Sequence, residues 1–164
     1  MPTIDVRVPH PDYVDAHESI QAARDCYLGE RAVKARGDLY LPRLTGQTPT
    51  EYIAYKKRAT FYSIVARTVA ALTGLAIQGE ITKVGNQETL DQMDDAPHGM
   101  QLFEAQIKAI SELMLEGRFG ILVDAPDDSK TVGLYPYESD SIINWETDES
   151  GLYTMVVLTE QIAV

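Results

Sequence analysis

The sequence predicts an α+β fold in which N-terminal helices precede a helix packed on a small, mainly antiparallel sheet. Apolar residues in 101–117 recur at the spacing of an amphipathic helix, and Gly117 can adopt the left-handed conformation that commonly ends one. Directly afterwards, the run 119–123 is rich in β-branched and aromatic residues, which favours a strand. Turn residues and further apolar runs follow, so we expect consecutive antiparallel strands beside this helix.

The helix over 101–117 has two chemically distinct sides. We expect its apolar side to be buried against the strand 119–123 and its polar side to be solvated. The residues assigned to the buried side are Leu102, Phe103, Ile107, Ile110, Leu113 and Met114. The residues assigned to the solvated side are Glu104, Lys108, Ser111, Glu112 and Glu116.

Further strands are expected on the C-terminal side of this helix. The segment 125–130 contains the Pro, Asp and Ser of a turn, and 131–137 offers a return strand. Two more apolar runs lie within 141–160, on either side of a polar stretch and Gly151.

The N-terminal half is expected to be largely helical. Asp12 can cap a first helix that ends at Gly29, and residues 30–37 add about two helical turns. Pro42 prevents regular helix in the connector that follows.

The strongest local signal predicts a long capped helix from Thr48 to Gly74. Thr48 is the N-cap, Pro49 occupies the first helical position, and Glu51 is placed to complete a capping box. The first half of this helix is basic and should be solvated, whereas its second half is apolar and should be buried. Beyond it, 75–85 is expected to form one or two short strands, followed by a polar helix that Asn86 caps.

The domain organisation follows from these elements. We expect an extended arm over 1–11 and a single α+β domain over 12–164, with a helical part over 12–76 and a helix-plus-sheet part over 77–164. The arm holds three prolines and no lasting periodicity, so it either crosses to a neighbouring molecule or stays mobile. The chain ends within a strand-like run without a polar tail, which favours the front part of a longer protein.

Composition excludes several classes of protein. The single cysteine, Cys26, cannot form an internal disulfide, which is typical of a reducing compartment. No apolar segment reaches the roughly 20 residues that a membrane-spanning helix needs, so no membrane association is expected. The net charge of −11 disfavours tight non-specific binding of DNA, because neutralising phosphates requires clustered Lys and Arg.

Metal-ligand and nuclease patterns are weak. The three histidines, His10, His17 and His98, lack the spacing that places two ligands on one helical turn. The segment 126–130, which includes Asp127 and Lys130, resembles the two carboxylates and lysine of metal-dependent nucleases. Those groups must come from neighbouring strands to converge on a metal, whereas here they are contiguous in an expected turn.

Two further groups of residues are candidates for a site. Asp124 could join Glu138 and Asp140 in an acidic cluster, but no base or nucleophile pattern accompanies them. Tyr135, Tyr137 and Trp145 form an aromatic grouping of the kind found more often in a core or a subunit contact than in a stacking platform for bases. We therefore predict that the protein is not an enzyme and has no catalytic residue, cofactor or metal site.

The consecutive cations Lys56, Lys57 and Arg58, here called the basic turn, are the candidate interface residues. Such a run is most commonly a solvated helix face, and the alternatives are contact with nucleic acid or with an acidic neighbour. The first 70 residues contain 10 basic and 8 acidic side chains, whereas the remainder contains 4 and 17. This asymmetry favours contact between the basic turn and the acidic half of an adjacent subunit.

The order of several motifs resembles the N-terminal part of tailed-bacteriophage portal proteins. Each motif is weak alone, and the resemblance depends on their number and order along nearly the whole chain. They are GERAVK at 29–34, YLPRL at 40–44, the aromatic and basic pattern at 52–62, GRFGILVD at 117–124, the tyrosines flanking Pro136, and IINW at 142–145.

The resemblance implies a structural subunit of a ring, typically of twelve copies, at one vertex of the capsid. Viral DNA is packaged and ejected through such a ring without tight binding, and the terminase and then the neck or tail proteins attach to it. The expected location is accordingly the virion, and the host cytoplasm during assembly. The stem, clip and crown of the family are missing from these residues, so the chain would correspond to the outer wing.

Two alternatives remain from the sequence. One is a small phage-encoded nuclease that uses Asp124, Asp127 and Lys130 with a divalent metal. The other is a free-standing interaction domain.

Overall fold

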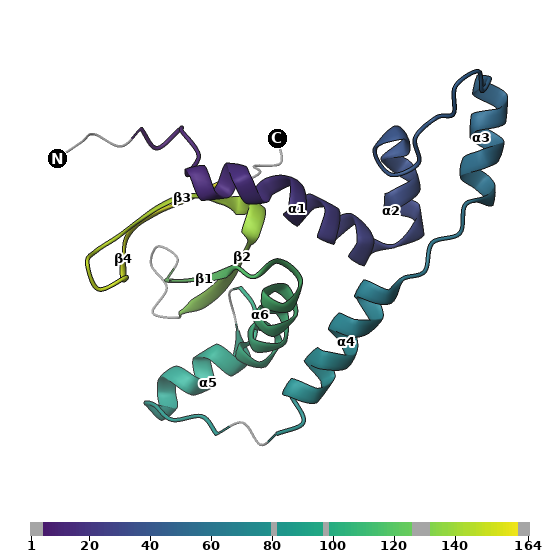
Figure 1. Ribbon diagram of the computed structural model, residues 1–164. Coiled ribbons are helices and arrows are strands. Elements are labelled where there is room, and N and C mark those ends of the chain that lie inside the picture. Colours follow the sequence, from purple (N-terminus) through teal and green to yellow (C-terminus); the bar gives the residue numbers. More distant parts are fainter. Residues whose placement is uncertain (1–4, 80–81, 97–98, 126–131, 161–164) are drawn as a thin grey trace.

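The computed structural model describes residues 5–79, 82–96, 99–125 and 132–160, and it has the predicted α+β class (Figure 1). The helices are α1 Pro11–Leu28, α2 Glu30–Ala35, α3 Pro49–Arg58, α4 Ile64–Ala76, α5 Gln87–Asp95 and α6 Leu102–Glu116. The strands are β1 Phe119–Asp124, β2 Gly133–Glu138, β3 Ile142–Thr147 and β4 Tyr153–Leu158. Short 3-10 turns, η1 Gly37–Leu39 and η2 Ser139–Ser141, connect some of these elements.

The strands form two separate antiparallel ribbons rather than one sheet. β1 pairs with β2 from Phe119 opposite Glu138 to Asp124 opposite Gly133. β3 pairs with β4 with two irregularities in register, and Gly151 adopts a positive φ of 83° in the connecting turn. The prediction of consecutive antiparallel strands is confirmed, while the expected turn over 126–131 lies outside the described residues.

Gly29 joins the first two helices. Its φ of 88° ends α1, as predicted, and the same residue is the N-cap of α2. The other end of α1 differs from the prediction, because the cap is His10 and not Asp12. The His10 Nδ1 atom accepts a hydrogen bond from the Asp12 amide at 3.2 Å, so Asp12 lies inside the first turn.

The predicted long helix begins as expected but breaks in two. Thr48 and Glu51 form both hydrogen bonds of the capping box: the Thr48 amide donates to Glu51 at 2.8 Å, and the Glu51 amide donates to Thr48 Oγ1 at 3.3 Å. The helix ends at Arg58, however, because Ala59 is extended with ψ 131°. A second helix, α4, then runs to Ala76, so Gly74 lies within it and does not end it.

Tertiary contacts surround the break. Phe61 lines the same small cavity as Val33 and Tyr40, so this segment lies beside α2 and its connector. Lys34 Nζ also donates a hydrogen bond to the Lys57 carbonyl at 3.2 Å, which satisfies an acceptor that a helix end leaves free. Pattern alone could not predict this, because the competing partners lie far away in sequence.

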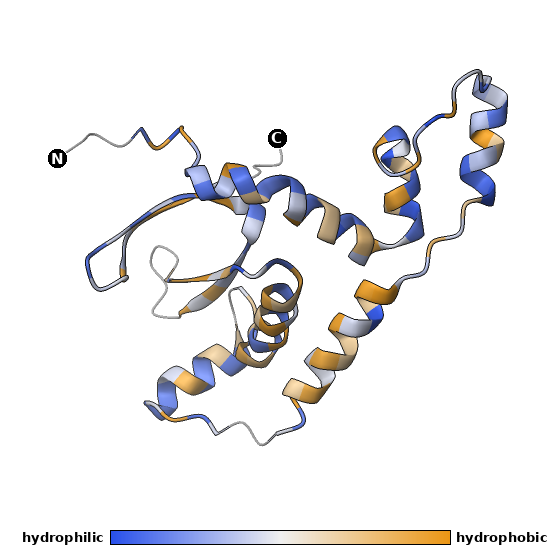
Figure 2. Cartoon of the chain, viewed as in Figure 1, coloured by the Kyte–Doolittle hydropathy of each residue, from blue (hydrophilic) through white to orange (hydrophobic). Residues whose placement is uncertain are grey.

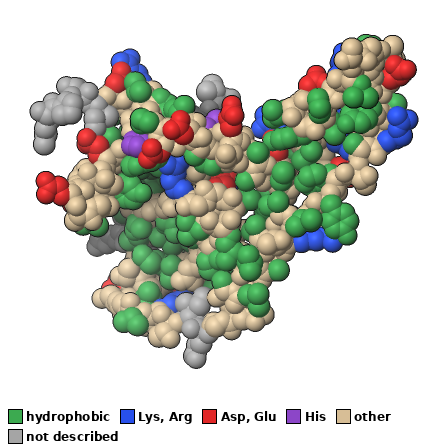
Figure 3. Space-filling model, in the orientation of Figure 1, with side chains coloured by type: hydrophobic (Ala, Val, Ile, Leu, Met, Phe, Trp, Pro, Cys, Tyr) green, Lys and Arg blue, Asp and Glu red, His purple; other side chains and the backbone are tan. Residues whose placement is uncertain are grey.

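Burial of α4 also differs from the prediction. The helix packs on α1 and α6, but only Val69 and Thr73 are buried within it. Ile64 and Leu75 remain 60% and 62% exposed. Figure 2 shows α4 as a mainly apolar helix, and Figure 3 shows hydrophobic side chains on the molecular surface along it.

The segment after α4 contains no strand among its described residues, so that expectation is wrong for 82–84. The polar helix is confirmed as α5, because the Asn86 side chain caps it by accepting from the amides of Glu88 and Thr89. None of the helices in the described ranges is long and apolar enough to span a bilayer.

The arm is attached to its own chain over its described end. The His10 amide donates to the Ile143 carbonyl at 2.8 Å, and the Asn144 side chain donates to the Val8 carbonyl at 2.8 Å. The His10 ring also stacks on Trp145 with 4.1 Å between centroids. The prediction of a mobile or crossing arm is therefore wrong for residues 8–10, and Pro11 belongs to α1.

This packing predicts unequal effects of truncation within α4. Val69→Ala should lower the free energy of unfolding by roughly 1–3 kcal/mol, because the side chain is buried against neighbouring helices. Leu75→Ala, on the exposed side, should change it by no more than about 0.5 kcal/mol. Urea titrations followed by circular dichroism measure both values. Equal losses would contradict the orientation of α4.

Candidate functional site

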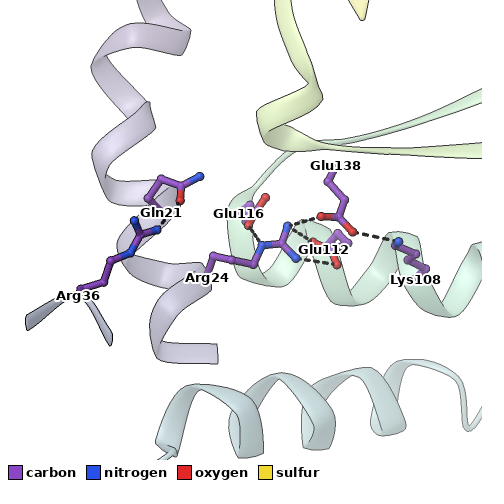
Figure 4. Close-up of polar contacts among 7 residues, drawn as sticks. All are labelled: Gln21, Arg24, Arg36, Lys108, Glu112, Glu116 and Glu138. Carbon is purple, nitrogen blue, oxygen red and sulfur yellow. Dashed lines mark hydrogen bonds and ion pairs between the residues drawn. The ribbon is translucent and has the colours of Figure 1, made fainter. Parts of the chain in front are cut away.

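Arg24 connects α1 with α6 and β2. Its guanidinium reaches three carboxylates, Glu112 and Glu116 from α6 and Glu138 from β2, as Figure 4 shows. Lys108 of α6 contacts the last of these at 3.0 Å. We call these five residues the Arg24 cluster.

The geometry of the cluster places most of the charge inside the fold. Arg24 donates to both oxygens of Glu112, at 3.3 Å and 2.9 Å, and its third nitrogen lies 2.6 Å from Glu116 Oε1. That last contact is an ion pair outside hydrogen-bonding geometry, and both Glu116 oxygens are buried without a hydrogen-bond donor among the described residues. The Glu116 side chain is 1% exposed, so it depends on Arg24 for its charge balance.

The pKa values reflect burial and pairing. Burial raises the pKa of Glu116 above its ordinary value, and the nearby Glu112 acts in the same direction, which together outweigh the attraction of Arg24. Burial alone would lower the pKa of Arg24, but its ion pair with Glu116 and its hydrogen bonds to Glu112 outweigh that effect and raise the pKa.

The cluster contradicts the predicted sides of α6 at several positions, although Glu104 is exposed as expected and Leu102, Ile107 and Ile110 are half-buried. Glu112 is buried at 7% exposure, whereas Leu113 and Met114, expected in the core, are 50% and 42% exposed. The only buried apolar residue of α6 is Ala105. The apolar pattern of α6 does not indicate this, because the arginine that buries its carboxylates lies on another helix.

A sequence signal for the cluster did exist. Arg24 lies four residues after the buried Ile20, on the same side of α1, where an apolar residue would be expected. Glu112 and Glu116 are also four residues apart and therefore share one side of α6. A charged residue within an apolar stripe, together with paired carboxylates elsewhere, indicates a buried ion pair.

A second polar contact fixes the angle between α1 and α2. Asp25 is buried, and its Oδ2 atom accepts hydrogen bonds from Arg36 and from the Tyr40 hydroxyl, both at 2.8 Å. Arg36 also donates to Gln21 on α1 at 3.1 Å. The hydrogen bond to Asp25 raises the pKa of Arg36 above its ordinary value.

The basic turn lies at the C-terminal end of α3. Lys56 Nζ is 4.9 Å from the centroid of the Tyr52 ring, and Lys57 and Arg58 are exposed. Cations in the last turn interact favourably with the helix dipole, so this position has a local explanation. Figure 1 shows α3 projecting away from the two ribbons.

The nuclease residues are not brought together. Asp124 and Glu138 lie at opposite ends of the β1–β2 ribbon, so the proposed acidic cluster with Asp140 does not form. Asp127, Lys130 and His98 lie outside the described residues. The described ranges contain no group of three or more His, Cys, Asp or Glu that could hold a metal ion.

A cavity of about 390 Å³ separates the two ribbons. Its walls are mostly apolar and include β1, Trp145 of β3 and Val156 of β4, with Arg118 at its edge. Tyr137, from the predicted aromatic grouping, is buried beside it and donates its hydroxyl to Glu160. Trp145 is also a wall of this cavity, while Tyr135 lies elsewhere on β2.

The Arg24 cluster should be essential for stability. Arg24→Met leaves Glu112 and Glu116 buried without their cation, so the free energy of unfolding should fall by roughly 3–5 kcal/mol. The matched control is Arg31→Met on the exposed side of α2, which should change it by about 0.5 kcal/mol or less. Chemical denaturation of both variants tests this, and similar losses would exclude a central role for Arg24.

The raised pKa of Glu116 predicts a pH dependence. The folded chain holds this proton more tightly than the unfolded chain, so the stabilisation it gives is complete below the ordinary value of 4.5 and is lost as the pH rises through the folded pKa. Glu116→Gln should therefore gain stability relative to the wild type as the pH rises above the ordinary value of 4.5. Glu104→Gln, exposed on the same helix, should show no such trend. A loss for Glu116→Gln over this range would contradict the predicted direction.

No family model, curated protein or solved structure matches the chain.

Proposed function

We propose that the chain is a structural subunit of a ring of the phage-portal type, as part of its wing. The observation that carries the proposal is the large total surface that the isolated chain leaves accessible, to which many exposed large hydrophobic side chains contribute. Its accessible surface is 11683 Å², compared with roughly 8,100 Å² expected for a compact monomer of 18.2 kDa. A chain with this excess is better suited to burial against copies of itself than to independent existence.

The uncovered surface is concentrated on particular elements. Ile64, Leu72 and Leu75 are exposed on α4, and Phe103 and Leu113 are exposed on the neighbouring α6. Packing a second molecule on these two helices would remove large aliphatic and aromatic side chains from water. In a closed ring each subunit contacts its two neighbours through two different surfaces. The apolar surface of α4 and α6 on one subunit would therefore pack on a different surface of the next subunit.

The basic turn gives this contact a direction. Lys57 and Arg58 are exposed near the end of the projecting α3, while the C-terminal part of the chain carries most of the acidic residues. A head-to-tail arrangement would place the basic turn of one subunit beside acidic residues of the next. Such contacts guide association and set its register more than they add affinity.

The remaining parts of the proposal follow from the resemblance. Viral double-stranded DNA would pass through the ring, and the net charge of −11 fits a wall that does not hold it tightly. Capsid, terminase and neck or tail proteins would be the other partners. The virion, and the host cytoplasm during assembly, would be the location.

The test is the mass of the assembled protein. In analytical ultracentrifugation, the chain, or any longer product that contains it, should form a closed oligomer at about 0.1 M salt that weakens near 1 M, where the screening length falls to about 3 Å. Changing Lys56, Lys57 and Arg58 together to Glu should weaken the oligomer. Leu72→Glu and Leu75→Glu should prevent it.

Controls separate the interface from the ring itself. Arg31→Glu reverses an exposed charge on α2 and should leave assembly unchanged. A ring that is insensitive to salt and to the triple change would retain the proposed function but exclude the basic turn. A monomer under every condition would exclude the ring, and DNA cleavage that requires a divalent metal would favour the nuclease alternative.

A further inference from the structure

The outer edge of β1 is an unpaired strand edge. In the β1–β2 register Ile121 lies opposite Pro136, which has no amide hydrogen, so this pair is one that exchanges no hydrogen bonds. The same alternation places Phe119 and Val123 in non-bonded pairs, and therefore the amides and carbonyls of these three residues point away from β2. No described residue outside β2 bonds to them.

The other edge of this ribbon is already used. The Leu134 carbonyl of β2 accepts a hydrogen bond from the Met100 amide at 2.9 Å, and Gly99 forms a bridge with Leu134. A Cβ at Gly99 would lie 2.4 Å from the Leu134 carbonyl oxygen, so glycine permits this approach. The unpaired groups of the ribbon are thus on the β1 side.

The cavity between the ribbons lies along that edge. Four consecutive residues of β1, 119–122, line the cavity. Side chains alternate between the two faces of a strand, so a cavity that touches consecutive residues lies along the edge of β1 and not on one face. The opposite wall is one side of the β3–β4 ribbon, where Trp145 pairs with Val156 and Ile142 pairs with Leu158. β1 also lacks the lysines, prolines and bulges that commonly protect an exposed edge.

A cation marks one end of the cavity. Arg118 precedes β1, donates to the Ser139 carbonyl at 3.0 Å, and lies 4.4 Å from the centroid of the Trp145 ring. Its Nε atom is buried with no hydrogen-bond acceptor among the described residues. Unlike Arg24, it therefore has no bonded carboxylate in the described part of the chain.

We propose that β1 accepts an added strand from a partner protein, namely an extended segment of alternating apolar residues with a carboxylate near Arg118. The segment would pair antiparallel with the outward groups of Phe119, Ile121 and Val123. Its apolar side chains would fill the cavity against Trp145 and Val156. The carboxylate would pair with the guanidinium of Arg118 at one end of the cavity.

Three features together favour a peptide strand as the occupant. The outward amides and carbonyls match a backbone, the apolar cavity matches every second side chain, and Arg118 matches one acidic end. Arg118 lies at the N-terminal end of β1, so a strand that pairs antiparallel with β1 has its C-terminal end near Arg118. The carboxylate should therefore be close to the C-terminus of the added segment. This inference does not depend on ring formation.

The test uses defined peptides and fluorescence anisotropy with the full chain. A fluorescein-labelled, amidated peptide KTVTVTVE should bind, and its reversed sequence EVTVTVTK, which moves the carboxylate to the other end, should bind about tenfold more weakly. Two methylated forms of KTVTVTVE extend the test, one with methyl groups on the amide nitrogens of all three valines and one with them on those of all three threonines. Only one of these two methylated forms should lose binding. This follows because alternate amides of a strand point to opposite edges.

Protein variants test the same surface. Ile121→Pro removes an outward amide without removing a bond to β2, and Val156→Glu introduces a charge on the opposite wall. Both should reduce peptide binding at least tenfold while retaining the circular dichroism spectrum. Unchanged binding by both variants, or equal binding of the two methylated peptides, would overturn the proposal.

Other occupants give different results. Competition by octanoate as strong as that by unlabelled peptide would assign the cavity to a small amphiphilic carboxylate and overturn the proposal. Self-association that Ile121→Pro abolishes, without peptide binding, would assign the edge to a second copy of the chain and would likewise overturn it. Loss of ring assembly in the Leu72 and Leu75 variants with peptide binding intact would separate this inference from the proposed function.

Discussion

The ion pairing of Arg24 determines how the helical part meets the ribbons. One guanidinium holds α1 against α6 through Glu112 and Glu116 and against β2 through Glu138. Burying these charges costs desolvation energy, and the arrangement is tolerated only because the partners lie within ion-pair distance. Glu112 and Glu116 occupy part of the buried side of α6, and the larger apolar residues Leu113 and Met114 remain on the surface.

This arrangement bears on the core. Ala105 is the only apolar residue of α6 that is fully buried, while Leu102, Ile107 and Ile110 are half-buried, and α4 packs on this helix. α4 in turn buries little more than Val69 and keeps its outer aliphatic side chains in water. The exposed apolar surface that supports the proposed assembly is therefore related to the buried ion pairs of Arg24, and not simply to an apolar composition.

The two surfaces that could receive partners differ in chemistry and lie on different elements. The surface on α4 and α6 consists of large side chains without unpaired backbone groups, which suits helix packing. The edge of β1 presents backbone amides and carbonyls beside a cavity, which suits strand addition. A subunit with two unlike surfaces can join unlike neighbours, whereas a single self-complementary surface would produce only pairs.

The sequence by itself determined the local structure where the deciding residues are close together. The capping box at Thr48, the Asn86 cap, the helix ends at Gly29 and Gly117, and the strand order after α6 all depend on short-range patterns. Tertiary structure decided the rest: the long helix ends at Arg58, Arg24 holds buried carboxylates of α6, and His10 binds the arm to β3. These outcomes depend on partners distant in sequence, whose burial and charge outweigh a propensity difference of about 1 kcal/mol per residue.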